Sequence, residues 1–159
     1  MSKQIDPANS VFSGLNSEHW MNLESVARIE VTSEDRAHPL EDALSPSNGT
    51  GWRAAEPGRQ ILRVLFDKPQ TLRHIHLVFA ENQTPRTQEV LLRWSRGNHQ
   101  PFEQIVRQQY NFAPPSKEIE DYAVELNGVK RLEMEINPSI GGGDYYASLA
   151  ELRLRLAIG

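Results

Sequence analysis

Arg86 is the strongest candidate in this sequence for binding a ligand. It lies between Glu81 and Gln88. A guanidinium is planar and donates paired hydrogen bonds, which match vicinal hydroxyls or a carboxylate. Glu81 and Gln88 would add hydrogen-bond acceptors. The alternative is that Arg86 pairs with Glu81 or Glu89 and only holds its loop in place. The cluster therefore predicts either a ligand-binding loop or an internally paired one.

Tyr145 and Tyr146 form a second candidate, because they closely follow three consecutive glycines, Gly141 to Gly143. A tyrosine offers a flat apolar ring with a polar tip, on which a ligand can stack. The glycines would let the backbone approach that ligand closely. The alternative is a flexible hairpin whose rings pack against the domain. Trp52 is open to the same two interpretations, as a core residue or as a platform.

The sequence contains no motif of catalysis or metal binding. It has no cysteine, which excludes disulfides and cysteine-based nucleophiles or metal ligands. It also lacks a GxSxG segment, a phosphate loop and a zinc motif. His74 and His76 would share one face of a strand, a spacing that can bind a metal, but no third ligand stands near them. The run Glu118, Glu120 and Asp121 is interpreted as a solvated loop. We therefore expect a protein that is not an enzyme, with no catalytic and no metal-binding residue.

The length and the net charge of the chain limit the kinds of molecule that it could bind. A chain of 159 residues points to one domain. Its net charge is -4, with 17 basic and 21 acidic residues, which argues against binding to a nucleic-acid backbone. No apolar run approaches the roughly 20 residues that span a bilayer, and the N-terminus lacks the apolar core of a signal peptide. We expect a cytoplasmic protein with neither nucleic acid nor membrane as a partner. The oligomeric state is not indicated.

The elements that must position these candidates are strands, because apolar and polar residues alternate along most of the chain. We expect an N-terminal arm over residues 1–24 and a single domain over residues 25–159, with short helical turns within 17–21 and 38–44. Tight turns are expected at Asp67–Pro69, at 95–101 and at Asn127-Gly128, which is the strongest hairpin dipeptide of the chain. The expected strands cover residues 26–31, 61–66, 72–79, 87–94, 102–112, 119–126, 132–136 and 149–156. About eight strands with almost no helical periodicity predict an all-β antiparallel sandwich or barrel.

The order of the strands also predicts which loops meet. Consecutive strands in such folds mostly run in opposite directions, so alternate loops share one end of the sandwich. The long loops near residues 51–60, 80–86, 112–118 and 137–146 fall at one end, and the tight turns fall at the other. Loops presented by a rigid scaffold are the usual place for binding residues. We therefore expect Arg86 and the two tyrosines to gather on one side of the domain.

Several segments resemble the discoidin or coagulation-factor type C family. They are SEDRAHPLEDALSPSNGTGWRA, the strand that ends in DKP, HIHLVFAENQTPRTQEVLLRWS and YYASLAELRL, and the resemblance covers roughly residues 25–157. It implies the galactose-binding-like jelly-roll β-sandwich and a domain without catalytic activity. Members include bacterial carbohydrate-binding modules, lipid-binding domains and protein-interaction domains.

The resemblance also implies roles for individual residues. Arg86 matches an arginine that grips ring hydroxyls in the sugar-binding members, and Tyr146, or its neighbour Tyr145, matches an aromatic residue that stacks on the sugar. Trp52 matches the tryptophan of a threonine-x-tryptophan segment. The next residue is often histidine in galactose-binding members and is Arg53 here. This departure bears against galactose as the ligand.

Many relatives also hold a structural calcium through an aspartate-glycine turn, a threonine and a glutamate. Thr50 and Glu151 match two of these positions, but Ser45-Pro46 replaces the aspartate-glycine turn. Calcium takes about six to eight oxygen ligands, several of them anionic. We therefore expect no cofactor and leave a structural calcium as an open alternative.

These observations together predict a non-catalytic ligand-binding domain. It would recognise a carbohydrate, or a similar polyhydroxylated small polar ligand, through the loops at one end of the sandwich. The alternative is an intracellular protein–protein interaction module of the same fold. The expected ligand-binding residues are Trp52, Arg53, Glu81, Arg86, Gln88, Tyr145 and Tyr146.

Overall fold

The computed structural model describes residues 20–44, 51–97 and 99–156, and strands dominate it. The two helices have four residues each, and neither of the helices in this part of the chain is long and apolar enough to cross a membrane. In chain order the elements are α2 (Leu23–Val26), β1 (Ala27–Val31), α3 (Glu41–Leu44), β2 (Trp52–Arg53), β3 (Gln60–Glu81), β4 (Arg86–Ser95), β5 (Glu103–Phe112), β6 (Ser116–Asn137), β7 (Ser148–Leu149) and β8 (Glu151–Leu156).

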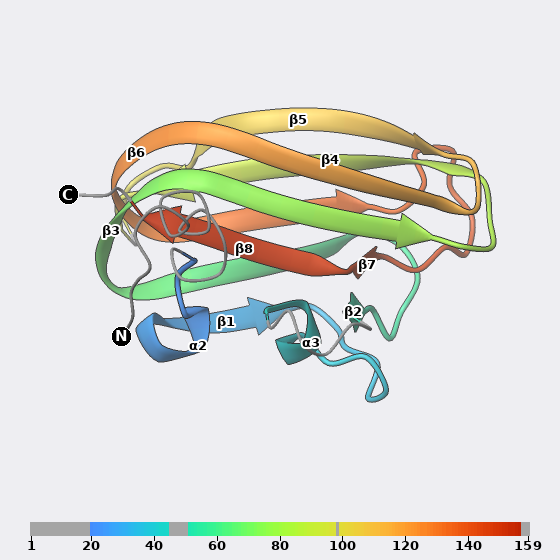
Figure 1. The fold of residues 1–159 in the computed structure, drawn as a ribbon, viewed down its shortest axis with the longest axis horizontal. Coiled ribbons are helices and arrows are strands. Elements are labelled where there is room, and N and C mark those ends of the chain that lie inside the picture. The colour runs from blue at the N-terminus through green and yellow to red at the C-terminus, as the bar shows by residue number, and fades with distance from the viewer. Residues whose placement is uncertain (1–19, 45–50, 98, 157–159) are drawn as a thin grey trace, which may run out of the picture.

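The strands pair antiparallel and form two layers (Figure 1). The larger layer contains β1, the first half of β3, the second half of β6, β4 and β5, in that order. In the smaller layer, β8, the second half of β3 and the first half of β6 lie side by side. The long strands β3 and β6 therefore belong to both layers. The alternating pattern predicted an antiparallel sandwich or barrel, and the structure is a sandwich with the jelly-roll arrangement that the family resemblance implied.

The turns predicted at Asp67–Pro69 and Asn127-Gly128 are wrong as tight hairpin turns. Each lies inside one long strand, β3 or β6, which bends from one layer into the other. The two strands stay paired through the bend, with Gln70 opposite Val129 and register shifts on either side. Extra residues at such irregularities bend a strand and increase its twist, and Gly128 has a φ of 76°. The hairpin signal marks a corner at which both strands change layers.

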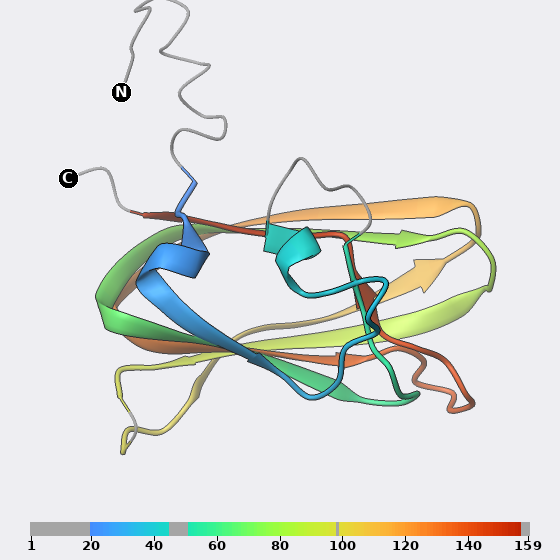
Figure 2. The same ribbon diagram turned by 90° about the horizontal axis from the view of Figure 1, so that it is seen from below.

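Alternate residues of the paired strands face inward between the layers and form one core. Figure 2 shows the two layers from the side. Burial of this apolar surface is the main force that holds the layers together. The predicted inward faces of the central strands are confirmed, whereas Leu156, at the end of β8, is 37% exposed. The buried residues include Ile75, Leu77 and Phe79 of β3, Val90, Leu92 and Trp94 of β4, Leu132, Met134 and Ile136 of β6, and Leu152 and Leu154 of β8.

The long loops predicted to share one end of the sandwich do lie together, on the right-hand side of Figure 1. The start of β4 pairs with the end of β5, with Arg86 opposite Phe112. The N–H of Gly58 donates to the carbonyl of Tyr145 over 2.9 Å, which joins the loop before β3 to the loop after β6. The rigid layers therefore bring segments from distant parts of the chain to one end.

The described residues before the expected domain boundary pack against the sandwich. The N–H of Met21 donates to the carbonyl of Leu154 over 2.7 Å, and Leu23 is buried. The boundary between residues 24 and 25 falls inside α2, which is also the first helical turn observed. The helical turn predicted from Ser17 begins outside the described residues, as does most of the predicted arm.

Candidate ligand-binding face

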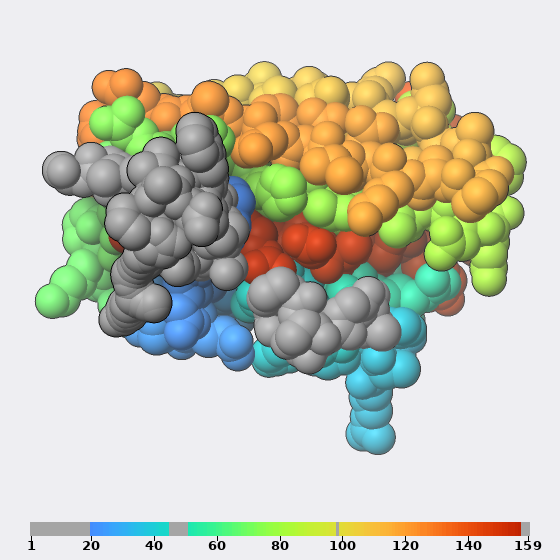
Figure 3. Space-filling view, viewed as in Figure 1, coloured from blue at the N-terminus to red at the C-terminus, as the bar shows by residue number. Residues whose placement is uncertain are grey.

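A shallow depression of about 660 Å³ lies beside β2, and three segments line it. They are the stretch that follows β1, the end of β2 with the two residues after it, and a residue shortly before β7. The stretch after β1, light blue in Figure 3, projects from the body of the molecule. We call this hollow the Tyr146 depression. Its lining residues are Glu34, Asp35, Arg36, Arg53, Ala54, Ala55 and Tyr146.

Backbone pairing holds the three segments in place. β2 pairs antiparallel with β7, with Arg53 opposite Ser148. The N–H of Asp35 donates to the carbonyl of Arg53 over 2.8 Å, and the N–H of Arg53 donates to the carbonyl of His38 over 3.1 Å. Successive side chains of a strand point to opposite faces. Trp52 therefore enters the core while Arg53 points outward into the depression.

The side chains of the Tyr146 depression combine an aromatic ring with charges of both signs. The guanidinium carbon of Arg53 lies 5.1 Å from the centroid of the Tyr146 ring, and Tyr146 is 36% exposed. The carboxylates of Glu34 and Asp35 each accept a backbone N–H of their own segment, over 2.8 Å and 3.0 Å. The hollow thus offers a partly exposed ring, donors and acceptors, which is the chemistry that a polyhydroxylated ligand requires.

Arg86 is buried in a second cluster, and its side chain is only 4% exposed. Its Nε donates to Oε1 of Glu81 over 2.7 Å. Its Nη1 donates to Oε1 of Gln88 over 3.0 Å and to the carbonyl of Pro138 over 2.7 Å. The guanidinium also lies 4.8 Å from the centroid of the Phe112 ring. One side chain therefore ties the loop before β4 to β5 and to the loop after β6.

Glu81 completes this cluster as the acceptor. Its Oε2 accepts the backbone N–H groups of Gln83 and Thr84, over 2.9 Å and 3.0 Å. Burial raises the pKa of Glu81, but the hydrogen bonds from Gln83, Arg86 and Thr84 outweigh it and hold the pKa below its usual range. Gln88 is fully buried, and its Nε2 has no hydrogen-bond partner among the described residues.

The predicted site residues on the loops therefore divide into two groups. Arg53 and Tyr146 lie together in the depression, whereas Arg86, Glu81 and Gln88 form the buried cluster. The pairing of Arg86 with Glu81 is the internal arrangement considered as the alternative to ligand binding. The direct contact of these three residues with a ligand stays a prediction.

Trp52 and Tyr145, the two other predicted residues, point elsewhere. Trp52 is 1% exposed, and its Nε1 donates to the carbonyl of Ser33 over 3.0 Å. Tyr145 is half-buried and packs close to Gly143, where an added Cβ would lie 2.9 Å from its ring. Of the two adjacent tyrosines, Tyr146 is the one that reaches the depression.

Glu34, Asp35 and Arg36 line the depression but were not among the predicted ligand-binding residues. They stand in a long irregular stretch in which no periodicity separates exposed from buried positions. Their neighbour Tyr146 lies far away in the sequence, and only the pairing of β2 with β7 brings it near. The polar character of the stretch was the only local signal, and it is too general to select these three residues.

The densely polar run of β5 is divided between the two faces of its layer. On the outer face, Arg107 donates to Glu89 over 3.0 Å. On the other face, the hydroxyl of Tyr122 donates to Gln108 over 2.6 Å and shares a hydrogen bond of 2.7 Å with the hydroxyl of Tyr110. The first contact connects β5 with β4, the others connect β5 with β6, and none is part of the Tyr146 depression.

The acidic run from Glu118 to Asp121 lies in β6 and is not the solvated loop that was predicted. Glu118 and Glu120 are half-buried, whereas Asp121 is exposed. Burial, together with the neighbouring Glu118, raises the pKa of Glu120 to about 7. This carboxyl therefore keeps its proton close to neutral pH, but it does not line the depression.

The two histidines of β3 contact different partners. Nδ1 of His74 lies 2.8 Å from Nη2 of Arg155, and Nδ1 of His76 lies 4.0 Å from a carboxylate oxygen of Asp121. In the part of the chain that the structure describes, no three or more histidine, aspartate or glutamate side chains are arranged to hold a metal.

The structure describes only one of the positions considered for a structural calcium. Glu151 lies 3.5 Å from Arg153. Thr50 and Ser45-Pro46 lie outside the described residues. The expectation of no cofactor therefore stays a prediction.

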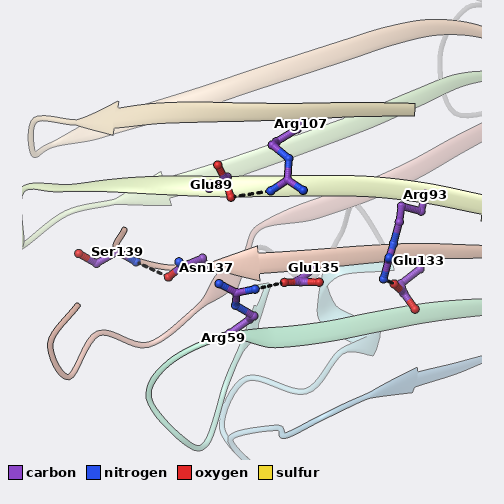
Figure 4. A network of polar contacts seen from close by, with 8 residues as sticks. All are labelled: Arg59, Glu89, Arg93, Arg107, Glu133, Glu135, Asn137 and Ser139. Atoms are coloured by element: carbon purple, nitrogen blue, oxygen red, sulfur yellow. Dashed lines mark hydrogen bonds and ion pairs between the residues drawn. The ribbon is translucent and has the colours of Figure 1, made fainter. Parts of the chain in front are cut away.

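A polar network covers the outer face of the larger layer (Figure 4). The side chain of Glu133 is 1% exposed and accepts hydrogen bonds from Nε of Arg63, over 2.8 Å, and from Arg93. Nearby, Arg59 donates to Glu135 over 2.5 Å. The network joins β3, β4 and β6 and pairs three arginines with two glutamates. Its geometry is that of a support for the layer rather than of a ligand site.

Comparison with known proteins gives structural neighbours only. No protein-family model and no curated protein sequence matches the chain. One solved neighbour is the family 32 carbohydrate-binding module of NanJ from Clostridium perfringens, in complex with galactose. It is 14% identical, the match covers 86% of this chain and 97% of that chain, and the TM-score is 0.64.

Two further neighbours have the same architecture. The module CpGH89CBM32-5 from Clostridium perfringens, in complex with GalNAc-β-1,3-galactose, is 14% identical over 86% of this chain and 99% of its own, with a TM-score of 0.63. The family 32 module of AlyQ, in complex with 4,5-unsaturated mannuronic acid, is 12% identical over 83% of this chain and 96% of its own, with a TM-score of 0.61. Together with the two-layer topology, these matches show that the chain has the galactose-binding-like, discoidin-type jelly-roll fold.

Proposed function

We propose that this chain is a non-catalytic carbohydrate-binding module whose ligand occupies the Tyr146 depression. One observation carries the proposal: the guanidinium of Arg53 lies 5.1 Å from the centroid of the partly exposed Tyr146 ring. Both residues were expected to bind the ligand, and the pairing of β2 with β7 brings them together. Structural neighbours that are named for galactose or GalNAc-β-1,3-galactose complexes support the same class of ligand.

Four side chains of the depression have a role in this proposal. The ring of Tyr146 contacts the apolar face of a sugar, as aromatic residues do in sites that bind ligands with an apolar side and a polar rim. The guanidinium of Arg53 donates to ring hydroxyls. The carboxylates of Glu34 and Asp35 accept from hydroxyls, since each is already oriented by a hydrogen bond to backbone.

In the same proposal, the buried cluster around Arg86 shapes the face. Arg86 fixes the carbonyl of Pro138, in the loop that leads to Tyr146. A side chain with 4% exposure and three hydrogen bonds to protein acceptors has little left to offer a ligand. Its role is to hold the loop in the conformation that binds.

We propose a non-catalytic module because of where the carboxyl groups lie. A glycosidase needs an acid with a raised pKa facing a second carboxylate across the scissile bond. Burial and Glu118 raise the pKa of Glu120, but Glu120 does not line the depression. Glu34 and Asp35 are neighbours on one segment. The depression is therefore better suited to binding a glycan than to cleaving one.

The test is a calorimetric titration of the folded protein with a panel of neutral and acidic saccharides. We expect millimolar or tighter binding of at least one saccharide and its loss in Tyr146→Ala. Ile119→Ala is the matched control, because Ile119 is an exposed apolar side chain of β6 outside the depression, and it should bind as the unmodified protein does. A folded protein that binds no saccharide contradicts the proposal. Capture of one stoichiometric protein partner that survives excess sugar would favour the protein-interaction alternative.

A further inference from the structure

The arginines of this chain are almost all engaged by other side chains or by backbone. Arg131 donates to Ser95 and to the carbonyl of Gln100, and Arg155 contacts His74. The arginines within 4.0 Å of a glutamate carboxylate are Arg28, Arg59, Arg63, Arg73, Arg86, Arg93, Arg96, Arg107 and Arg153.

Arg36 and Arg53 are the exceptions within the described residues. Neither guanidinium has a hydrogen bond or an ion pair there, and the contact that Arg53 makes is with the ring of Tyr146. Both arginines line the Tyr146 depression. The two guanidiniums that find no acceptor among the described residues therefore line one depression, although 16 residues separate them in the sequence.

The nearby carboxylates do not account for these two guanidiniums. Glu34 and Asp35 line the same depression, yet each accepts a backbone N–H of its own segment, and neither approaches Arg36 or Arg53 to within 4.0 Å. The guanidinium donors remain open while the carboxylates are held apart from them. A ligand that supplies a negative charge on the arginine side would gain charge-assisted, paired hydrogen bonds.

We infer that the Tyr146 depression selects an acidic saccharide, one that carries a carboxylate or a sulfate ester. This inference rests on the proposed function and makes it more specific. The anionic group lies against Arg36 and Arg53, the sugar ring lies against Tyr146, and hydroxyls donate to Glu34 and Asp35. Planar guanidiniums pair with carboxylates and with sulfate esters alike, so the two kinds of anion are distinguished by experiment.

The test compares neutral sugars with counterparts that carry an acidic group at C6. Calorimetric titrations compare galactose with galacturonic acid and galactose 6-sulfate, and glucose with glucuronic acid, at low and at high salt. We expect an acidic sugar to bind roughly tenfold more tightly than its neutral counterpart at low salt, because hydrogen bonds to charged groups are stronger than neutral ones. Salt should reduce this preference, since it screens exposed charges. Whether the uronic acid or the sulfate binds better identifies the anionic group.

Variants test whether Arg36 and Arg53 cause the preference for the acidic sugar. The double variant Arg36→Gln, Arg53→Gln should bind the acidic and the neutral sugar equally. The matched control is Arg96→Gln, because the guanidinium of Arg96 also lies over an aromatic ring, at 4.5 Å from the centroid of Trp94, but pairs with Glu103. This control should keep the preference for the acid.

The other possible results contradict either the inference alone or both the inference and the proposed function. Equal affinity for acidic and neutral sugars contradicts the inference and leaves the proposed function intact. A preference for the acid that survives in the double variant contradicts the inference as well, because the anion then binds elsewhere. A folded protein that binds none of these sugars, nor any other saccharide of the wider panel, contradicts both statements.

Discussion

Arg86 and Glu81 form a buried ion pair: Nε of Arg86 donates to Oε1 of Glu81 over 2.7 Å, and the two side chains are 4% and 14% exposed. The pair closes the loop between β3 and β4. A second nitrogen of the same guanidinium donates to the carbonyl of Pro138, in the loop that carries Tyr146. One side chain therefore couples two of the loops at the end of the sandwich where we place the ligand.

The first prediction concerns this ion pair. Arg86→Met keeps most of the side-chain length but leaves the Glu81 carboxylate without its cation in a partly buried position. We expect the free energy of unfolding, measured by urea denaturation, to fall by about 3 kcal/mol, because removing one partner of a buried ion pair is strongly destabilising. The control is Arg107→Met, whose pair with Glu89 is exposed on the arginine side at 51%, and it should cost no more than about 1 kcal/mol. Equal losses in both variants would show that the buried pair has no special role.

The second prediction concerns Glu133, which accepts hydrogen bonds from both Arg63 and Arg93 on the outer face of the larger layer. Figure 4 shows Glu133 with Arg93. Glu133→Gln keeps the shape of the side chain and removes its charge, so both guanidiniums lose their counter-ion. We expect a loss of about 3 kcal/mol in the free energy of unfolding.

The control for Glu133 is Glu135→Gln in the same strand. Glu135 pairs with Arg59, whose side chain is 59% exposed, so solvent can replace much of this interaction. The expected loss is below about 1 kcal/mol. A larger loss for Glu135→Gln than for Glu133→Gln in urea denaturation would contradict the view that burial sets the importance of these carboxylates.

The third prediction concerns Gly51, which precedes Trp52 at the start of β2. Its φ is +72°, and an added Cβ would lie 2.5 Å from the carbonyl oxygen of Leu149 and 2.7 Å from the Cα of Ala150. Gly51→Ala should therefore cost about 1–2 kcal/mol for the left-handed backbone, plus about 1–3 kcal/mol for the displaced strand. The change should also weaken binding at the Tyr146 depression, since it disturbs the pairing of β2 with β7.

Gly58→Ala is the control for Gly51, because Gly58 also has a positive φ, of +90°, but nothing lies within 4 Å of an added Cβ. It should show only the backbone cost of about 1–2 kcal/mol. Thermal and urea unfolding of the two variants measure the difference. If Gly58→Ala destabilised the fold as much as Gly51→Ala, close packing against β7 would not be the reason for the glycine at position 51.

The fourth prediction concerns pH. Burial and Glu118 raise the pKa of Glu120 in the folded chain to about 7, from a usual value of 4.5. Between these two values the folded state binds more protons than the unfolded state, so the free energy of unfolding falls as the pH rises through this window. Glu120→Gln should remove this contribution and give a flatter pH profile, with a gain in stability at pH values above about 7.

Urea denaturation across the pH window measures the profile of the Glu120→Gln variant. The control is Glu125→Gln, an exposed carboxylate of the same strand, which should retain the slope of the unmodified protein. A slope that is unchanged in Glu120→Gln would assign the pH dependence to other groups.

The sequence by itself determined the fold class and the ends of the sandwich. Apolar residues at every second position can be recognised locally in the sequence, because a strand places every second side chain on the same face. In β3 these residues are Ile75, Leu77 and Phe79. These residues are buried as expected. Because consecutive antiparallel strands run in opposite directions, alternate loops were expected at the same end of the sandwich. The structure confirms that the long loops lie at one end. The same local signals were misleading at Asn127-Gly128, where pairing with β3 continues through the bend and no hairpin forms.

Only the tertiary structure decided which of the candidate residues meet. From the sequence, Arg86 was the clearest candidate to bind a ligand and Tyr146 belonged to the second candidate, yet Arg86 is buried with Glu81, while Tyr146 faces Arg53 in an open depression. No local pattern distinguishes an arginine that donates to its own loop from one that is left without an acceptor. That difference depends on the pairing of β2 with β7 and on the carbonyl of Pro138, which are contacts between segments that only the folded chain brings together.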